Sequence, residues 1–396
     1  MCDIIKPEAG QTFAQFLHKN VRTYWLLIYQ SPRTGTTGYR SPRKGTEMSE
    51  KNRKSTIVTI AKAVGVSPST VSRAFDPTSR ISDPMRERIF RCAQEQDYVP
   101  NRAASRLPMK TISIGLLMND FYEPATVEFL RGINDGYREL RDLKIHFESC
   151  IIGYSSKTVA ELENALERFR GFDGLVVSGF IDPEETVLLN RYYRDNPNLV
   201  LLQTDIPGVG RLSVSYHDPG VASRLAAEFI ADCLRKSESK NVVLFTGERK
   251  WQIHGMAAEA FHRAAKENGL NIVGSYDMKD SSDVMNWQLY DIYVKQGIKP
   301  DGIFITSGKS LDLCRYIKDK NLSSDTVLVT YDVTKEIADY IKQGVVLATV
   351  HQNFYNQAKS AFVNLVRHIL GEKTMDETLL QLPELVFGSN IDFYLG

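Results

Sequence analysis

The chain has 396 residues, enough for two or three domains with cores of their own. Its hydrophobic fraction of 42% and charged fraction of 24% are those of a globular protein, which excludes a disordered or fibrous chain. The formal net charge of +1 hides an asymmetry, since residues 1–110 carry 19 Lys and Arg against 9 Asp and Glu and the rest carries 30 against 39. A basic head on an acidic body indicates a nucleic acid or a membrane as the partner of the head.

The five cysteines are far apart and show neither a CxxC pair nor metal-ligand spacing. We therefore expect reduced, mostly buried thiols in a cytoplasmic protein. The longest apolar run near the N-terminus, residues 24–29, is far shorter than the ~18 residues that a transmembrane helix needs. Its flanks are not those of a signal peptide either, so the sequence predicts neither export nor a membrane partner.

Residues 1–54 show no sustained helical or strand period, and residues 30–50 are rich in Ser, Pro, Arg, Thr and Gly. We expect a disordered N-terminal extension over 1–54. Met48 begins a stretch typical of a protein start, so residues 1–47 are interpreted as an upstream extension or a misassigned start. The alternative is a basic tail that adds affinity for DNA.

Residues 55–98 are predicted to form a small head of three helices. Apolar residues recur at helical spacing from Ile57 to Val64, and Gly65 would end this helix as a C-cap residue. Ser67 and Pro68 are an N-cap and first-turn pair that would start a second helix.

A turn over 76–79 precedes a third helix, which begins at 82–84 and should direct Arg86, Arg88 and Arg91 largely outward. A helix, a glycine turn and a second helix with a polar outer face form the geometry that places one helix in the DNA major groove. The alternative is a three-helix bundle whose charges are merely solvated.

The outer face of the second helix carries Ser67, Ser69, Thr70, Ser72 and Arg73. Arg73 could make a bidentate contact to guanine, and the positive charge around it would attract phosphates. These residues predict a DNA-reading surface.

From residue 111 onward, strands alternate with helices, which predicts an α/β fold with parallel sheets. The strand pattern repeats at shifts of 127 to 134 residues. The matched strands are 111–117 with 241–246, 173–178 with 301–306, the strand ending at Asp205 with that ending at Asp332, and the strand ending at 217–218 with that ending at 351–352. We therefore expect two similar α/β halves rather than one large sheet.

Ligands of open parallel sheets bind beyond the carboxyl ends of the strands. Two facing halves should form a cleft there. The side chains expected to line it are Asn119, Phe121, Asp205, Asp218, Ser307, Asp332 and Gln352.

The segments 56–61, 64–67, 70–73 and 98–101 together resemble the head and hinge of the lactose-repressor (LacI) family of bacterial transcription regulators, without a gap from Thr56 to Leu107. The resemblance implies a homodimer, possibly a tetramer, on a palindromic double-stranded DNA operator. With the surface described above, it gives the candidate DNA-binding residues Thr56, Ser67, Pro68, Ser69, Thr70, Ser72, Arg73, Arg80, Asn101, Ala104 and Leu107.

The resemblance also implies a hinge over 99–110 that becomes helical on DNA, with Leu107 wedged into the minor groove. Three positions depart from the family. Thr59 replaces an Asp, Ser105 replaces a common hinge Arg, and Pro68 offers no hydrogen bond at a base-reading position. These departures leave the operator sequence open.

The body, 111–396, resembles more weakly a two-lobed, periplasmic-binding-protein-like sugar sensor. The expected lobes are about 111–217 plus 353–380, and about 218–352 plus 381–396. The resemblance implies that Phe121 and Tyr122 pack on a sugar ring and that Asp332 and Gln352 bind its hydroxyl groups. The candidate effector-binding residues are Asn119, Phe121, Tyr122, Trp251, Ser307, Asp332 and Gln352.

Each of these residues has a simpler alternative. Asp332 could cap the helix that would follow at 333–334, Phe121 could belong to the core, and Trp251 could merely fill a loop. Two positions of the family are also lost, because Ala257 and Ala260 stand in the stretch where an Arg is expected and 307–308 is Ser-Gly instead of Asn-Asp. The effector chemistry has therefore changed, or effector binding has been lost.

The sequence lacks the motifs of common enzyme sites. Gly308-Lys309-Ser310 is not a phosphate loop, because Ile303 stands where the first Gly is required. No HExxH, GxSxG or GxGxxG pattern occurs in a suitable context. We expect no enzymatic activity, cofactor or metal.

These observations predict a sequence-specific DNA-binding transcription regulator with a helix-turn-helix head and an α/β body. More specifically, they predict a repressor of carbohydrate-utilisation genes that a small sugar-like effector releases from its operator. One alternative is a regulator of the same fold that is controlled by a protein partner or lacks a small-molecule effector. Another is an α/β enzyme fused to the head, which the missing motifs disfavour.

Overall fold

The computed structural model describes residues 56–75, 79–96, 98 and 111–395. The chain divides into two compact units, one with the N-terminal helices and one with both β-sheets. The predicted extension over 1–54 and the predicted hinge over 99–110, with Asn101, Ala104 and Leu107, lie outside the described residues. No helix in the described ranges is both long and apolar enough to cross a membrane.

The head consists of α2 (Ile57–Val64), α3 (Pro68–Ala74) and α4 (Asp83–Glu95). Gly65 ends α2 with a φ of 77°, a left-handed conformation that glycine adopts without strain. Ser67 is the N-cap of α3, and its side chain accepts a hydrogen bond from the Thr70 amide. The predicted helix boundaries of the head are thus confirmed.

A small apolar core holds the three helices together. Its buried members are Ile60, Ala61, Val71, Ala74 and Ile89. Arg86 differs from the prediction, because its guanidinium is half-buried and donates to the Ala74 and Ser79 carbonyl oxygens at 2.7 and 2.9 Å. This arginine therefore fastens α4 to the end of α3 instead of pointing into solvent.

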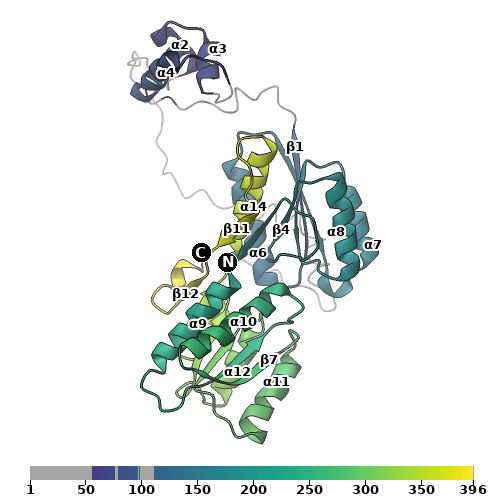
Figure 1. Cartoon of the computed structure of the whole chain (residues 1–396), viewed down its shortest axis with the longest axis vertical. Helices are drawn as coiled ribbons and strands as arrows, with labels where there is room; N and C mark the ends of the chain where they lie inside the picture. Colours follow the sequence, from purple (N-terminus) through teal and green to yellow (C-terminus); the bar gives the residue numbers. More distant parts are fainter. Residues whose placement is uncertain (1–55, 76–78, 97, 99–110, 396) are drawn as a thin grey trace, which may run out of the picture. The chain divides into compact units, whose positions relative to one another are not determined.

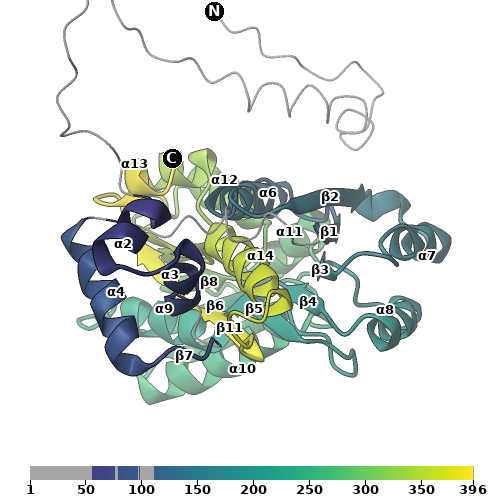
Figure 2. The same ribbon diagram turned by 90° about the horizontal axis from the view of Figure 1, so that it is seen from above.

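The first lobe of the body is built on a six-stranded, all-parallel sheet. Its strands are β1 (Ile112–Asn119), β2 (Ile145–Ile152), β3 (Gly174–Ser178), β4 (Leu199–Leu202), β5 (Ser213–His217) and β11 (Thr378–Gln381), in the order β11-β5-β4-β3-β1-β2. Its helices are α6 (Glu123–Glu139), α7 (Val159–Arg168), α8 (Pro183–Asp195) and α14 (Phe354–Ile369). Helices α6 and α14 pack together on the side of the sheet opposite α7 and α8 (Figure 1 and Figure 2).

The second lobe repeats this plan. Its strands are β6 (Asn241–Thr246), β7 (Asn271–Asp277), β8 (Gly302–Ile305), β9 (Val327–Tyr331), β10 (Ala348–His351) and β12 (Glu384–Val386), in the order β12-β10-β9-β8-β6-β7. Only β12 runs antiparallel to its neighbour. Its helices are α9 (Pro219–Cys233), α10 (Gln252–Glu267), α11 (Ser282–Tyr290), α12 (Ser310–Asp319) and α13 (Lys335–Lys342), with a π-helical turn at Asp291–Lys295 after α11.

The two sheets confirm the predicted α/β fold with two similar halves, because the matched strands take the same places in both strand orders. Continuous apolar strands and the inner faces of the flanking helices form a separate core on each side of the second sheet, as expected for parallel strands covered on both faces. The chain passes between the sheets after His217, after His351 and after Gln381. These crossings bring the carboxyl ends of β1, β5, β9 and β10 to one cleft.

The described cysteines are all free, but the expectation that most are buried is wrong. Cys314 is buried, Cys92 and Cys150 are half-buried, and Cys233 is exposed. Cys233 is exposed because it lies beside Asp232 on the outer side of the last turn of α9.

Candidate functional site

A cavity of about 130 Å³ lies between the two lobes, at the carboxyl ends of the strands. The candidate effector residues that line it are Phe121, Tyr122, Ser307, Asp332 and Gln352. Asn119 and Trp251 line an adjoining cavity of about 40 Å³, which also borders Phe121 and Tyr122. The structure thus brings all seven candidates to one cleft but divides them between two cavities.

Asp332 is the buried acid of the cleft. It follows β9 with a φ of 69°, and its Oδ1 atom accepts a hydrogen bond from the Gln352 Nε2 atom at 2.5 Å. The Tyr122 hydroxyl lies close enough to this carboxylate to hydrogen-bond with it and helps to lower its pKa. Burial raises the pKa of Asp332 to about 6, against the lowering effect of the two hydrogen bonds. No described cation forms an ion pair with this carboxylate. It can therefore accept a strong hydrogen bond from a neutral hydroxyl or amide group.

The helix-cap interpretation of Asp332 is wrong. The N-cap of α13 is Thr334, whose hydroxyl accepts a hydrogen bond from the Ile337 amide at 3.2 Å. Asp332 instead receives its hydrogen bonds from side chains inside the cleft.

Three buried polar atoms around the two cavities have no hydrogen-bond partner among the described residues: Gln352 Oε1, His217 Nδ1 and Trp251 Nε1. The side chains that carry them are only 7%, 1% and 5% exposed. An unsatisfied buried polar atom costs about 1–3 kcal/mol, so such atoms are rare unless something else binds them. Their position indicates a cleft with unused donor and acceptor groups.

Two imidazoles in the cleft are held neutral. Burial lowers the pKa of His217 to about 3. Burial also lowers the pKa of His254, whose Nδ1 atom lies 3.2 Å from Thr306 Oγ1. At neutral pH both rings therefore offer hydrogen bonds but no positive charge.

Aromatic rings join the lobes at the entrance to the cavities. Phe121, from the first lobe, stacks on Trp251, from the second, with ring centroids 5.6 Å apart and an interplanar angle of 27°. Tyr154 also meets Phe121 edge-on, with ring centroids 4.7 Å apart. Phe121 is half-buried and lines both cavities, so it is not an enclosed core residue.

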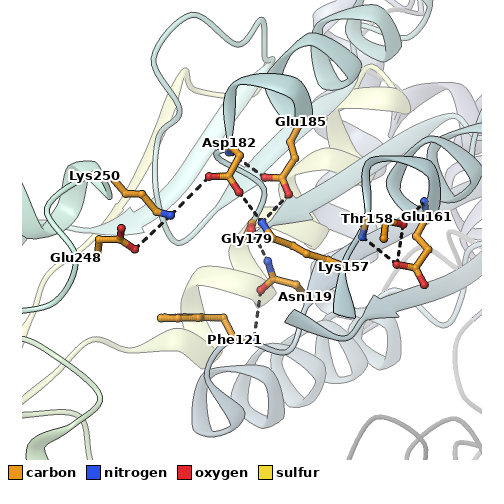
Figure 3. A network of polar contacts seen from close by, with 10 residues as sticks. All are labelled: Asn119, Phe121, Lys157, Thr158, Glu161, Gly179, Asp182, Glu185, Glu248 and Lys250. Carbon is orange, nitrogen blue, oxygen red and sulfur yellow. Dashed lines mark hydrogen bonds and ion pairs between the residues drawn. The ribbon is translucent and has the colours of Figure 1, made fainter. Parts of the chain in front are cut away.

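An ionic network runs beside the aromatic contact (Figure 3). Lys157 Nζ lies 2.6 Å from Glu185 Oε1 and 3.0 Å from Asp182 Oδ2. Lys250 comes from the second lobe and lies 3.2 Å from Glu248 and 3.6 Å from Asp182. Asp182 therefore shares its charge between a lysine of its own lobe and a lysine of the other.

Asn119 has a local role in the structure. Its carboxamide donates to the Gly179 carbonyl oxygen and accepts a hydrogen bond from the Phe121 amide at 3.2 Å (Figure 3). Both of its polar atoms thus fix the loop that presents Phe121. Asn119 lines the smaller cavity but not the larger one.

Two residues expected in the cleft do not line either cavity. Asp205 lies three residues beyond the end of β4 and forms a bidentate ion pair with Arg211 at 2.6 and 2.7 Å. Asp218 caps α9 by accepting hydrogen bonds from the Gly220 and Val221 amides. Each carboxylate has a local partner that satisfies it.

Several lining residues were missed by the sequence analysis: Gln203, His217, Asp280, Lys309 and Tyr331. His217 and Tyr331 are the last residues of β5 and β9, so the rule that ligands bind at carboxyl strand ends could have identified them. Asp280 is brought in by a loop, where it accepts a hydrogen bond from the Ser307 hydroxyl at 2.8 Å.

The head presents most of its candidate residues to solvent. Those exposed are Thr56, Ser67, Pro68, Ser69, Arg73 and Arg80, and those half-buried are Thr70 and Ser72. The Ser67 hydroxyl lies 2.7 Å from Ser69 Oγ and 2.8 Å from Thr70 Oγ1. Arg73 makes no hydrogen bond or ion pair with any residue in the described ranges, so its guanidinium is available. Ser67, Ser69 and Thr70 thus form a polar surface at the start of α3, and Arg73 lies in its last turn.

Thr56 is also the N-cap of α2. Its hydroxyl accepts a hydrogen bond from the Thr59 amide at 3.3 Å, and the Thr59 hydroxyl accepts one from the Thr56 amide at 2.9 Å. Thr59, which stands where the family commonly has Asp, therefore completes a capping box.

Within the described ranges, no group of three or more His, Cys, Asp or Glu could hold a metal ion.

The family comparisons cover both units of the chain. Residues 56–101 match the model of bacterial regulatory proteins of the lacI family. Residues 114–373 match the periplasmic binding protein domain. The chain is 23% identical over 340 residues to catabolite control protein A of Priestia megaterium, covering 84% of this chain and 97% of that protein. It is 22% identical over 338 residues to the lactose operon repressor of Escherichia coli, covering 83% and 85%.

Solved structures share the fold of this chain. The Lac repressor bound to ONPG in its repressed state superposes with a TM-score of 0.56 at 19% identity, covering 84% of this chain and 98% of that one. GanP, a glucose-galactose binding protein from Geobacillus stearothermophilus, superposes with a TM-score of 0.62 at 16% identity, covering 71% and 99%. The chain therefore belongs to the periplasmic-binding-protein domain family through its body, and its head is a lacI-family domain of bacterial regulatory proteins.

Proposed function

We propose that this protein is a repressor of carbohydrate-utilisation genes that releases a palindromic operator when a small, neutral, polar ligand binds in the cleft. The observation that carries the proposal is the presence, in one chain, of a LacI-family head and a periplasmic-binding-protein-like body. Relatives include a ribose operon repressor of Bacillus subtilis, 24% identical over 348 residues, which supports the sugar-related role.

The head supplies the DNA-binding part. The polar start of α3 would enter the major groove, where Arg73 would reach a guanine and the hydroxyl groups of Ser67 and Ser69 would contact bases or phosphates. A single small head buries too little surface for tight specific binding, which supports a homodimer on two half-sites. The hinge at 99–110 would then contact the minor groove between the half-sites.

The cleft supplies the ligand-binding part. A neutral polyol offers hydroxyl groups that both donate and accept, which suits the unused acceptor of Gln352 and the unused donor of Trp251. Asp332 would accept a strong hydrogen bond from a hydroxyl group. Phe121 gives an apolar surface of the kind on which sugar rings pack.

Coupling between the two parts would be allosteric. The ligand contacts both lobes, so it favours one arrangement of the lobes over the other by its difference in affinity. The chosen arrangement would then decide whether the paired hinges of a dimer can fold on DNA.

A second candidate function is a regulator of the same fold that responds to a protein partner or to no small molecule. The small volume of the cleft favours it, since about 130 Å³ is less than the ~300–1,000 Å³ typical of ligand pockets. The loss of side chains at Ala257 and Gly308, both of which line the cavity, points the same way.

The test has two parts. The full chain would be used to select DNA from a random-sequence pool; recovery of a palindrome supports the operator proposal, and a pool without sequence preference contradicts it. Isothermal titration with pentoses, hexoses, polyols and their phosphates would then compare the wild type with Asp332→Asn. Binding that weakens in the variant supports a cleft ligand, whereas no heat from any compound favours the second candidate.

A further inference from the structure

Tyr122 belongs to the first lobe, but its side chain reaches the second. It is the N-cap residue of α6, and its ring meets Phe354 of α14 edge-on at 6.3 Å. Its hydroxyl lies within hydrogen-bonding reach of the carboxylate of Asp332, which follows β9 in the other lobe, and both residues line the larger cavity. Tyr122 therefore crosses the cleft and ends on the acid that a ligand would be expected to use.

Gly308 provides the space for this crossing. A Cβ atom at position 308 would lie 2.8 Å from Tyr122 Cε2 and 3.0 Å from Tyr122 Cδ2, distances too short for ordinary contact. The φ of Gly308 is not in the left-handed region, so lack of space rather than backbone conformation requires glycine here. The absent side chain at 308 and the tyrosine at 122 are thus complementary in shape.

The donors around Asp332 come from the protein itself. Gln352 and Tyr122 supply the two side-chain hydrogen bonds to its carboxylate. A ring carrying a hydroxyl group is also what a sugar would present at this place. The acid of one lobe therefore faces a ring hydroxyl from the other.

We infer that Tyr122 is a built-in occupant of the ligand position, which closes the cleft on itself and sets the size of the ligand that can enter. An engineered cavity of about 150 Å³ holds benzene, so the remaining 130 Å³ admits about six non-hydrogen atoms. A larger ring must displace Tyr122 from Asp332. The size limit rests on the proposed function, because it assumes that the cleft binds a ligand. The closure of the cleft by Tyr122 does not depend on that assumption.

Trp251 can report the closure without any ligand. Its indole is 5% exposed because Phe121 of the other lobe covers it. In a full chain that carries Trp25→Phe and Trp287→Phe, Trp251 is the remaining tryptophan of the three in the sequence. Quenching of its fluorescence by acrylamide then measures how often the cleft opens.

The test compares four single substitutions in that background, all without ligand. Tyr122→Phe removes the hydroxyl and keeps the ring, and Gly308→Ala forces the ring out of its place. Tyr355→Phe is the matched control for the first, because its hydroxyl donates to Asp135 at 3.1 Å within the first lobe. Gly171→Ala is the control for the second, because no atom lies within 4 Å of a Cβ built there.

We expect Tyr122→Phe and Gly308→Ala to raise the open fraction roughly tenfold or more, the effect of losing a hydrogen bond to a charged group, and thus to raise the quenching constant. The two controls should match the parent. In a Tyr122→Ala background, Gly308→Ala should have no further effect, because the atoms that it meets are gone.

Equal quenching in the parent and in Tyr122→Phe would overturn the inference, and so would an equal rise in the controls. If Gly308→Ala prevented folding, as judged by circular dichroism, Tyr122→Phe would decide alone. Selection of operator DNA is a separate assay on the same chain, so loss of the proposed function and failure of this inference are distinguishable.

Discussion

Lys250 Nζ lies 3.6 Å from Asp182 Oδ1, and this ion pair joins the second lobe to the first at the rim of the cleft (Figure 3). The stack of Phe121 on Trp251 joins the same loop of the second lobe to a different loop of the first, the one between β1 and α6. Polar and aromatic contacts therefore hold the rim together in parallel.

The ion pair should contribute little to stability. Both side chains are 44% exposed, and ion pairs at such sites are worth about 0–1 kcal/mol. Lys250→Met should lower the free energy of unfolding by less than about 1 kcal/mol, and high salt should remove the difference from the wild type.

The matched control is Arg191→Met, since Arg191 pairs with Glu163 inside the first lobe at similar exposure. Urea unfolding at low and high salt would measure both variants. A loss well above 1 kcal/mol for Lys250→Met alone would show that the rim pair does more than a surface pair can.

Arg73→Ala should weaken binding to the selected operator by about 1–3 kcal/mol and relax the base preference at one position of each half-site, because a bidentate guanine contact carries sequence information. Fluorescence anisotropy with the operator and its single-base variants would measure both effects. Arg91→Ala, an exposed arginine of α4, serves as the control. Uniform weakening on every DNA would mean that Arg73 binds phosphate only.

Ser67 and Ser69 should separate in their effects. Ser67 caps α3, and loss of an N-cap hydroxyl costs about 1 kcal/mol, so Ser67→Ala should destabilise the head as well as weaken DNA binding. Ser69→Ala removes a neighbouring exposed hydroxyl that caps no helix, so it should leave head stability unchanged. Thermal unfolding followed by circular dichroism would compare the two; equal destabilisation contradicts the assigned cap.

Asp332 should make stability depend on pH in a direction unusual for a carboxylate. Burial raises its pKa from 3.8 to about 6, so between these values the folded protein binds more protons than the unfolded chain. The contribution of this group is present below pH 4 and is lost as the pH rises through 6. The shift of about 2 units corresponds to about 3 kcal/mol.

Asp332→Asn is a suitable neutral variant, because Asn tolerates the left-handed backbone that Asp332 adopts at φ 69°. Relative to this variant, the wild type should lose up to about 3 kcal/mol of unfolding free energy between pH 4 and pH 7. The lowered pKa of His217 makes the folded protein less stable at acid pH. Because His217 is present in both proteins, its contribution cancels in the difference between them. A difference that stayed constant with pH would contradict a buried acid with a raised pKa.

The sequence predicted the head well because its signals are local. Gly65 and Ser67 act within one helical turn of where they stand, so a cap and a stop can be recognised without the rest of the fold. The repeated strands were recognisable for a related reason, since buried parallel strands read as continuous apolar runs. The inward direction of the Arg86 side chain was not predicted. Its acceptor is a backbone carbonyl oxygen of another helix, and the sequence pattern does not show such a contact.

The cleft was predicted in part. Strand ends placed Asp332 and Gln352 correctly beside the cavity, but Asp205 has a similar position in the pattern and pairs with Arg211 instead. The crossing of Tyr122 depends on side-chain direction between lobes, which periodicity does not encode. The sequence shows Gly308 only as a lost side chain, because the pattern carries no information on its closeness to the Tyr122 ring.

Recognition of a specific DNA sequence by the basic head underlies the proposed function. The most direct measurement is the affinity of the full chain for the selected palindrome and for scrambled DNA of equal length, over a range of salt concentrations. We expect a specific affinity at least about 10³-fold above the non-specific one, and a linear, steep fall of log K with log salt. Equal affinity for both DNAs, or an affinity that does not change with salt, would contradict it.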